Sequence, residues 1–166
     1  MNMDPITFKT KDMKKSIDKY LGISLVFLMV LMTLDVLWGV LTRYALGSQA
    51  DWSEELARFL LIWIGLLGAA YAAGQGMHLA IDLLMPKLKP DRQRQLYIFI
   101  HLLIIVFATG VLIIGGFRLM YLTNVLGQLS AALRIPMYLV YAVLPISGLL
   151  VVYYKIHNLR NIKSRF

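Results

Sequence analysis

Four long apolar stretches dominate this chain, and each is bounded by a basic residue or a histidine. They cover residues 20–42, 59–77, 95–117 and 135–154. Each is close to the ~20 residues that a helix needs to cross a hydrocarbon core about 30 Å thick. Only helices and closed barrels satisfy their backbone polar groups in lipid, and runs this long are typical of helices. The sequence therefore predicts an all-α integral membrane protein with four transmembrane helices.

The basic residues are unevenly distributed among the segments that connect these stretches. Of the 17 Lys and Arg residues, thirteen fall in the N-terminal tail, the link between the second and third helices, and the C-terminal tail. The positive-inside rule therefore predicts a multi-pass topology with both termini cytoplasmic. Contact with anionic lipid headgroups accounts for the basic excess, so nucleic-acid binding is not expected.

The four stretches and their short links use almost all of the 166 residues, of which 59% are hydrophobic. We expect one membrane domain over residues 1–166, with helices at roughly 17–44, 52–77, 92–120 and 135–156, and no room for a catalytic module. Residues 1–15 are expected to form a loose tail, and Pro145 to kink the fourth helix. The chain has no cysteine, which excludes thiol catalysis and cysteine-based metal sites. We therefore expect neither enzymatic activity nor a metal or other cofactor.

Ionisable side chains gather near the ends of the predicted helices that face away from the basic tails. Asp35 lies about 12 Å along the first helix from Arg43, too deep to reach water, and is expected to need an internal partner. Asp51 is the predicted N-cap of the second helix. A proton path would need polar groups at successive depths, so the pattern favours a fixed network of ion pairs that orients the helices. These charges are expected to pair within the subunit or across its interface with another. The expected members are Asp35, Arg43, Glu54, Glu55, Arg58 and Arg118, with Glu54 and Arg58 spaced as an i,i+4 pair.

Small residues recur every four positions along the second helix. One stripe comprises Gly65, Ala69 and Ala73, and another comprises Gly68, Ala72 and Gly76. Such stripes let helix backbones approach closely in lipid, either within this chain or against another protein.

Other polar and aromatic residues mark the boundaries of the membrane. Trp52 is expected to anchor the second helix at the interface. His78 and Asp82, also four residues apart, are either metal or haem ligands or a satisfied polar pair. Of the 3 histidines only His101 lies inside a predicted helix, which makes a poor set of haem ligands, so we favour the polar pair and predict no metal site.

The order of several short motifs is similar to that of a known family. Together they resemble the DctQ-type small membrane subunit of tripartite ATP-independent periplasmic (TRAP) transporters, over essentially the whole chain. The family is expected to carry a small residue where this chain has Arg134. The motifs are Arg43-Tyr44, Trp52-Ser53-Glu54-Glu55-Leu56-Ala57-Arg58, Gly68-Ala69-Ala70, Gly76-Met77-His78-Leu79-Ala80-Ile81-Asp82, and Ser130-Ala131-Ala132-Leu133-Arg134-Ile135-Pro136 followed by Tyr141 and Pro145.

The resemblance implies a three-part, sodium-coupled importer in a bacterial inner membrane. A periplasmic substrate-binding protein would capture an organic acid, of the C4-dicarboxylate or sialic acid class. A large elevator-type membrane subunit would move it, and this chain would be that subunit's fixed scaffold. Two alternatives remain open from the residues alone. One is a homodimeric four-helix ion or drug transporter, and the other is a haem or quinone membrane anchor.

Overall fold

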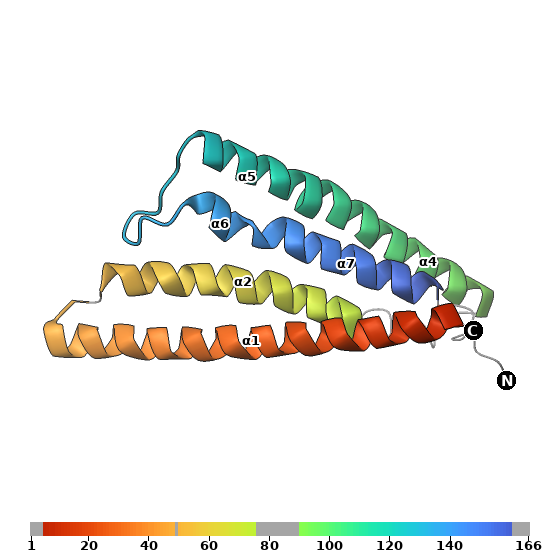
Figure 1. Ribbon diagram of the computed structural model, residues 1–166, viewed down its shortest axis with the longest axis horizontal. Coiled ribbons are helices and arrows are strands. Elements are labelled where there is room, and N and C mark those ends of the chain that lie inside the picture. Colours follow the sequence, from red (N-terminus) through yellow and green to blue (C-terminus); the bar gives the residue numbers. More distant parts are fainter. Residues whose placement is uncertain (1–4, 49, 76–89, 161–166) are drawn as a thin grey trace. The chain divides into compact units, whose positions relative to one another are not determined.

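The computed structural model describes residues 5–48, 50–75 and 90–160, and almost all of them are helical (Figure 1). Four helical spans in this part of the chain are long and apolar enough to cross a membrane: Met13–Leu46, Asp51–Gln75, Arg92–Val125 and Met137–Leu159. The prediction of an all-α protein with four membrane-spanning helices is therefore confirmed. The elements in chain order are α1 (Pro5–Leu46), α2 (Asp51–Gln75), α4 (Pro90–Phe107), the π-helix η2 (Ala108–Gly115), α5 (Gly116–Val125), α6 (Met137–Tyr141) and α7 (Val143–Arg160).

These elements form two compact units. The first unit comprises α1 and α2 as far as Leu67. The second comprises the end of α2 from Gly68, together with α4, η2, α5, α6 and α7.

Helix α1 begins at Pro5, so the expectation of a loose tail was wrong for residues 5–15. Proline suits the first position of a helix, because its missing N–H would have no helical partner there. No glycine or further proline follows before Gly22, and lysine and methionine are good helix formers. These local preferences extend the helix well beyond the membrane-spanning stretch.

The turn from α1 to α2 is tight. Gly47 has a φ of +76°, a left-handed conformation that glycine adopts without steric penalty. The backbone oxygen of Ala50 accepts hydrogen bonds from the N–H groups of Ser53 and Glu54, at 3.0 and 3.5 Å. Ala50 therefore holds the capping position that had been predicted for Asp51, which lies one residue further on, in the first turn of α2.

The second unit is built around small side chains that bring its helices close together. Its core cluster contains Ala70 and Ala73 of α2, Ala108 of η2 and Val151 of α7. At Gly148 of α7, an added Cβ would lie 2.8 Å from side-chain atoms of Leu112 and Ile113. In Figure 1, α7 runs along the continuous helix formed by α4, η2 and α5.

The fourth span is interrupted at Ala142, between α6 and α7. Pro145 lacks an N–H group, and its ring would clash with the carbonyl of Tyr141, four residues earlier, in a regular helix. The regular ladder resumes with the N–H of Ile146, which donates to the Ala142 oxygen at 3.4 Å. The helix is therefore interrupted within one turn of Pro145, the residue at which a kink was predicted.

Candidate functional site

The predicted network of charges is not assembled as expected around Asp35. This residue is buried, with an exposed fraction of 6%, and its two carboxylate oxygens accept no hydrogen bond from any described residue. Its backbone oxygen accepts a hydrogen bond from Ser53 Oγ at 3.1 Å, which ties α1 to the first turn of α2. The expectation of an internal partner for the Asp35 side chain was therefore wrong within the part of the chain that the structure describes.

The other charged residues of the first unit lie nearer the solvent. Arg58 donates to Glu54 Oε1 at 3.0 Å, and both side chains are 66% exposed. The expected i,i+4 pair is present, and exposed pairs of this kind contribute only about 0.3–0.5 kcal/mol. Arg43 is exposed and Glu55 is partly buried. In the second unit, Arg118 on α5 is also exposed.

The first small-residue stripe of α2 turns from the surface into the core. Gly65 and Ala69 are exposed, whereas Ala73 belongs to the core cluster of the second unit. Because an α-helix has 3.6 residues per turn, each step of four residues rotates the side-chain direction by roughly 40°. The intramolecular interpretation is therefore right for Ala73. Trp52, at the start of α2, is 41% exposed.

Two predicted site residues, His78 and Asp82, lie outside the described residues, as does Gly76 of the second stripe. Within the described residues, no group of three or more His, Cys, Asp or Glu side chains is placed to hold a metal ion.

His101 of α4 is held by its own helix. Its Nδ1 lies 2.9 Å from the backbone oxygen of Tyr97, and the two rings have centroids 3.9 Å apart with their planes tilted by 31°. Since a carbonyl oxygen only accepts, Nδ1 carries the hydrogen. The imidazole, with an exposed fraction of 1%, is therefore oriented by α4.

Lys155 of α7 is a buried residue that the sequence analysis missed, because it was counted with the basic C-terminal tail. It is fully buried, and Nζ lies 3.5 Å from the backbone oxygen of Ala73. This contact ties α7 to the last described turn of α2. The sequence contained a signal for the burial of Lys155. It lies four and eight residues after Val151 and Ser147, so the three residues share one face of α7, and that face is buried.

A second contact at the same place joins α7 to α2. Tyr154 is fully buried, and an added Cβ on Gly74 would lie 2.7 Å from its ring. Lys155 and Tyr154 together therefore fix the end of α2 against α7.

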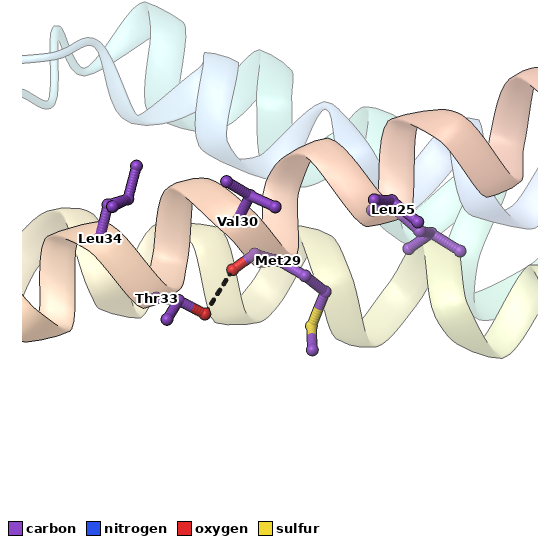
Figure 2. A pocket seen from close by; sticks show the side chains of 6 residues that line it. Leu25, Met29, Val30, Thr33 and Leu34 are labelled. Carbon is purple, nitrogen blue, oxygen red and sulfur yellow. Dashed lines mark hydrogen bonds between the residues drawn. The ribbon is translucent and has the colours of Figure 1, made fainter.

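The hollows on the surface of α1 are apolar. Figure 2 shows one that is lined by a single helix, in which the Thr33 hydroxyl donates to the Met29 oxygen at 2.8 Å. A binding site for a charged solute needs convergent polar groups, which this hollow does not offer. Its surface instead suits lipid chains or an apolar partner helix. The lining residues are Leu25, Val26, Met29, Val30, Thr33 and Leu34.

A further hollow, in the second unit, lies between α5 and α6 and is more polar. Its walls are formed by Phe117, Met120, Tyr121, Asn124 and Tyr138. Close by in sequence, the loop after α5 is held by hydrogen bonds from Ser130 N to the Ile135 oxygen at 2.9 Å and from Ile135 N to Ser130 Oγ at 3.0 Å.

Arg134 lies within this loop and has a φ of +53°, a left-handed conformation that favours glycine or asparagine. This backbone conformation gives a physical reason for a small residue at this position.

Comparison with known proteins gives a consistent family match. Residues 32–163 match the family model described as "Tripartite ATP-independent periplasmic transporters, DctQ component". The chain is 29% identical over 102 residues to the C4-dicarboxylate TRAP transporter small permease protein DctQ of Rhodobacter capsulatus, which covers 61% of this chain and 44% of that protein. It is 29% identical over 105 residues to the sialic acid TRAP transporter small permease protein SiaQ of Vibrio cholerae, covering 63% and 61%.

A third relative is much longer than this chain. The isethionate TRAP transporter permease protein DctMQ of Oleidesulfovibrio alaskensis is 30% identical over 131 residues, which is 78% of this chain and 20% of that protein. The chain thus spans less than two thirds of the length of each of these three relatives.

Proposed function

This chain belongs to the DctQ family, the small permease subunits of TRAP transporters, and we propose that it is the fixed scaffold of a sodium-coupled importer of organic acids. The family match over residues 32–163 is the observation that carries this proposal. The four membrane-spanning helices agree with a multi-pass membrane subunit.

The proposed partner in the membrane is the large permease subunit. TRAP small subunits pair with such a subunit, and the match to one fifth of the DctMQ permease protein agrees with this pairing. A periplasmic substrate-binding protein is the proposed third component, as in the family that the sequence resembles. We place the complex in a bacterial inner membrane.

The surface of this chain supports a role in anchoring. In the most apolar 18-residue windows of the Met13–Leu46 and Arg92–Val125 spans, 11% of the residues are buried. Most of these two spans is therefore available to lipid and to a partner subunit. A large embedded surface resists tilting, which suits the part of an elevator transporter that stays in place.

The proposed solute is an organic acid of the C4-dicarboxylate or sialic acid class. The three relatives carry the names of three different solutes at nearly the same identity to this chain. This is expected if the solute contacts lie in the other components. The apolar hollows on α1 support the same division of roles, since a carboxylate would need polar partners there.

Reconstitution into proteoliposomes tests this proposal. The isolated small subunit should move no labelled succinate or sialic acid. With the cognate large subunit, the binding protein and an inward sodium gradient, uptake should appear, and it should vanish when sodium is replaced by potassium.

Three results would contradict the proposal. Uptake by the small subunit alone would support the four-helix transporter that the sequence left open. A visible absorption spectrum of bound haem in the purified subunit would support a respiratory anchor. Full uptake by the large subunit and the binding protein without this chain would remove the scaffold role.

A further inference from the structure

Asp35 is a carboxyl group buried inside a membrane-spanning helix. Its exposed fraction is 6%, and neither carboxylate oxygen has a hydrogen-bond partner among the described residues. An ionised carboxylate in a low-dielectric medium is strongly unfavourable unless it is paired. Asp35 therefore lacks, among the described residues, the hydrogen-bonding or ionic partner that a buried carboxylate requires.

Among the described side chains of the first unit, no cation is both free and close enough to pair with Asp35. Arg43 is eight residues away on the same helix, about 12 Å at 1.5 Å per residue. Lys19 is sixteen residues away, about 24 Å on the same basis. Arg58 is already paired with Glu54 at 3.0 Å.

The position of Asp35 is nevertheless well fixed. Ser53, with an exposed fraction of 1%, donates to the Asp35 backbone oxygen at 3.1 Å. This bond anchors the backbone at Asp35 to the first turn of α2. The unpaired carboxyl is therefore held at a defined place and depth in α1.

Asp35 lies beside the open face of α1. Leu31, four residues before Asp35, is 38% exposed, and Trp38, three residues after it, is 49% exposed, so both adjoin Asp35 on the helix surface. A long basic side chain of a membrane protein packed on this face would therefore start within one helical turn of Asp35.

We propose that Asp35 forms a membrane-buried ion pair with an arginine or lysine side chain of the large permease subunit when the two subunits assemble. The inference rests on the proposed function, since it requires that subunit as a partner. Hydrogen bonds between charged groups are the strong ones, and a pair excluded from water fixes register as well as affinity. Asp35 would thus select the position at which the large subunit packs on α1.

The test compares two measurements on Asp35→Asn, a substitution of nearly equal size. The first is the thermal unfolding of the small subunit alone in detergent, where we expect stability to be kept or raised because an unpaired charge is removed. The second is the affinity for the co-expressed large subunit, where we expect a loss of about 30-fold or more. Asp51→Asn is the matched control, because Asp51 is exposed and its substitution should leave the affinity for the large subunit unchanged.

The partner residue is identified by combining Asp35→Asn with neutralisation of each membrane arginine and lysine of the large subunit in turn. One such change should weaken the wild-type complex and have no further effect with Asp35→Asn. Asp35→Leu, which places an apolar side chain in the buried position, repeats the test if the asparagine variant folds poorly.

Three results would overturn the inference. The first is an unchanged affinity for the large subunit. The second is a loss of stability of the isolated subunit, in both Asp35→Asn and Asp35→Leu, that is as large as the loss of binding free energy. The third is the absence of any arginine or lysine of the large subunit that is coupled to Asp35. If the wild-type chains fail to associate at all, the proposed function fails first.

Discussion

Three glycines determine how closely α7 approaches its neighbours in the second unit. At Gly148 an added Cβ would lie 2.8 Å from the Leu112 Cβ and 3.3 Å from the Ile113 backbone nitrogen. Neither atom moves without its helix, so a methyl group there must push η2 and α7 apart. Gly116 meets Leu144 and Pro145 in the same way, and Gly74 meets the ring of Tyr154. The separation of these helices is therefore set by the absence of side chains.

Gly148→Ala should destabilise the small subunit by about 1–3 kcal/mol, the range for overpacking a core. Gly68→Ala is the matched control, since an added Cβ at Gly68 meets nothing within 4 Å. Alanine also favours a helix over glycine by about 1 kcal/mol, so the control should be neutral or slightly stabilising. Thermal unfolding of both purified variants in detergent distinguishes them, and equal melting temperatures would contradict the close packing at Gly148.

The sequence showed that α2 carries small residues, but not which of them pack. The spacing suggested that Gly65 and Gly68 pack against another helix, but an added Cβ at either residue would meet no atom within 4 Å. At Gly74 an added Cβ would lie 2.7 Å from the ring of Tyr154. The difference depends on which helix lies alongside each position, and spacing along one helix does not contain that information. The same limit explains Lys155, which looked like part of a basic tail and is buried against the end of α2.

At the scale of elements, the third span contains a π-helix where the sequence predicted an uninterrupted α-helix. Hydrogen bonds in a π-helix run between residues five apart, so η2 holds an extra residue relative to an α-helix. Ala108 of η2 belongs to the core cluster, and Leu112 and Ile113 meet Gly148. The π-helix therefore lies where the third span packs against α7.

Deletion of Gly110 should convert η2 into an α-helix. The same faces of α4 and α5 should then still pack within the second unit. Gly110 is exposed, and its removal takes no side chain from the core. Deletion of Leu149, an equally exposed residue of α7, should rotate the rest of that helix by about 100° and destroy its packing. We expect the first variant to be recovered as a folded monodisperse subunit in size-exclusion chromatography and the second to aggregate. Aggregation of both would show that the extra residue is required.

The sequence predicted the elements that depend on composition and on proline. The four apolar stretches became four spans, and Pro145 interrupts the last of them at Ala142. The segment that forms η2 is apolar apart from Thr109 and its two glycines, and it has no period that distinguishes a π-helix from an α-helix. The helical start at Pro5 was missed because polar composition was interpreted as a loose tail, although the local helix preferences are good.

At the scale of the whole molecule, the spans differ in how much of their surface the chain itself covers. In the most apolar window of Met137–Leu159, 39% of the residues are buried, against 11% in Met13–Leu46. The chain itself therefore covers more of the α6–α7 span than of α1. Exposed residues of α1 include Phe27, Leu34 and Leu41, each more than half accessible. Such a chain needs lipid or a partner subunit to cover it.

The sidedness of the molecule in the membrane is predicted from its charges. Thirteen of 17 basic residues fall in the tails and the middle link, so these segments should face the cytoplasm. Because the chain has no cysteine, single cysteines at Lys15, Ser48 and Gln128, all exposed positions, report on this directly. An impermeant thiol reagent applied to cells with a permeabilised outer membrane should label positions 48 and 128. Position 15 should be labelled only after the inner membrane is opened. Labelling of position 15 in sealed cells, with protection of the other two, would invert the topology and place the α1–α2 turn on the cytoplasmic side.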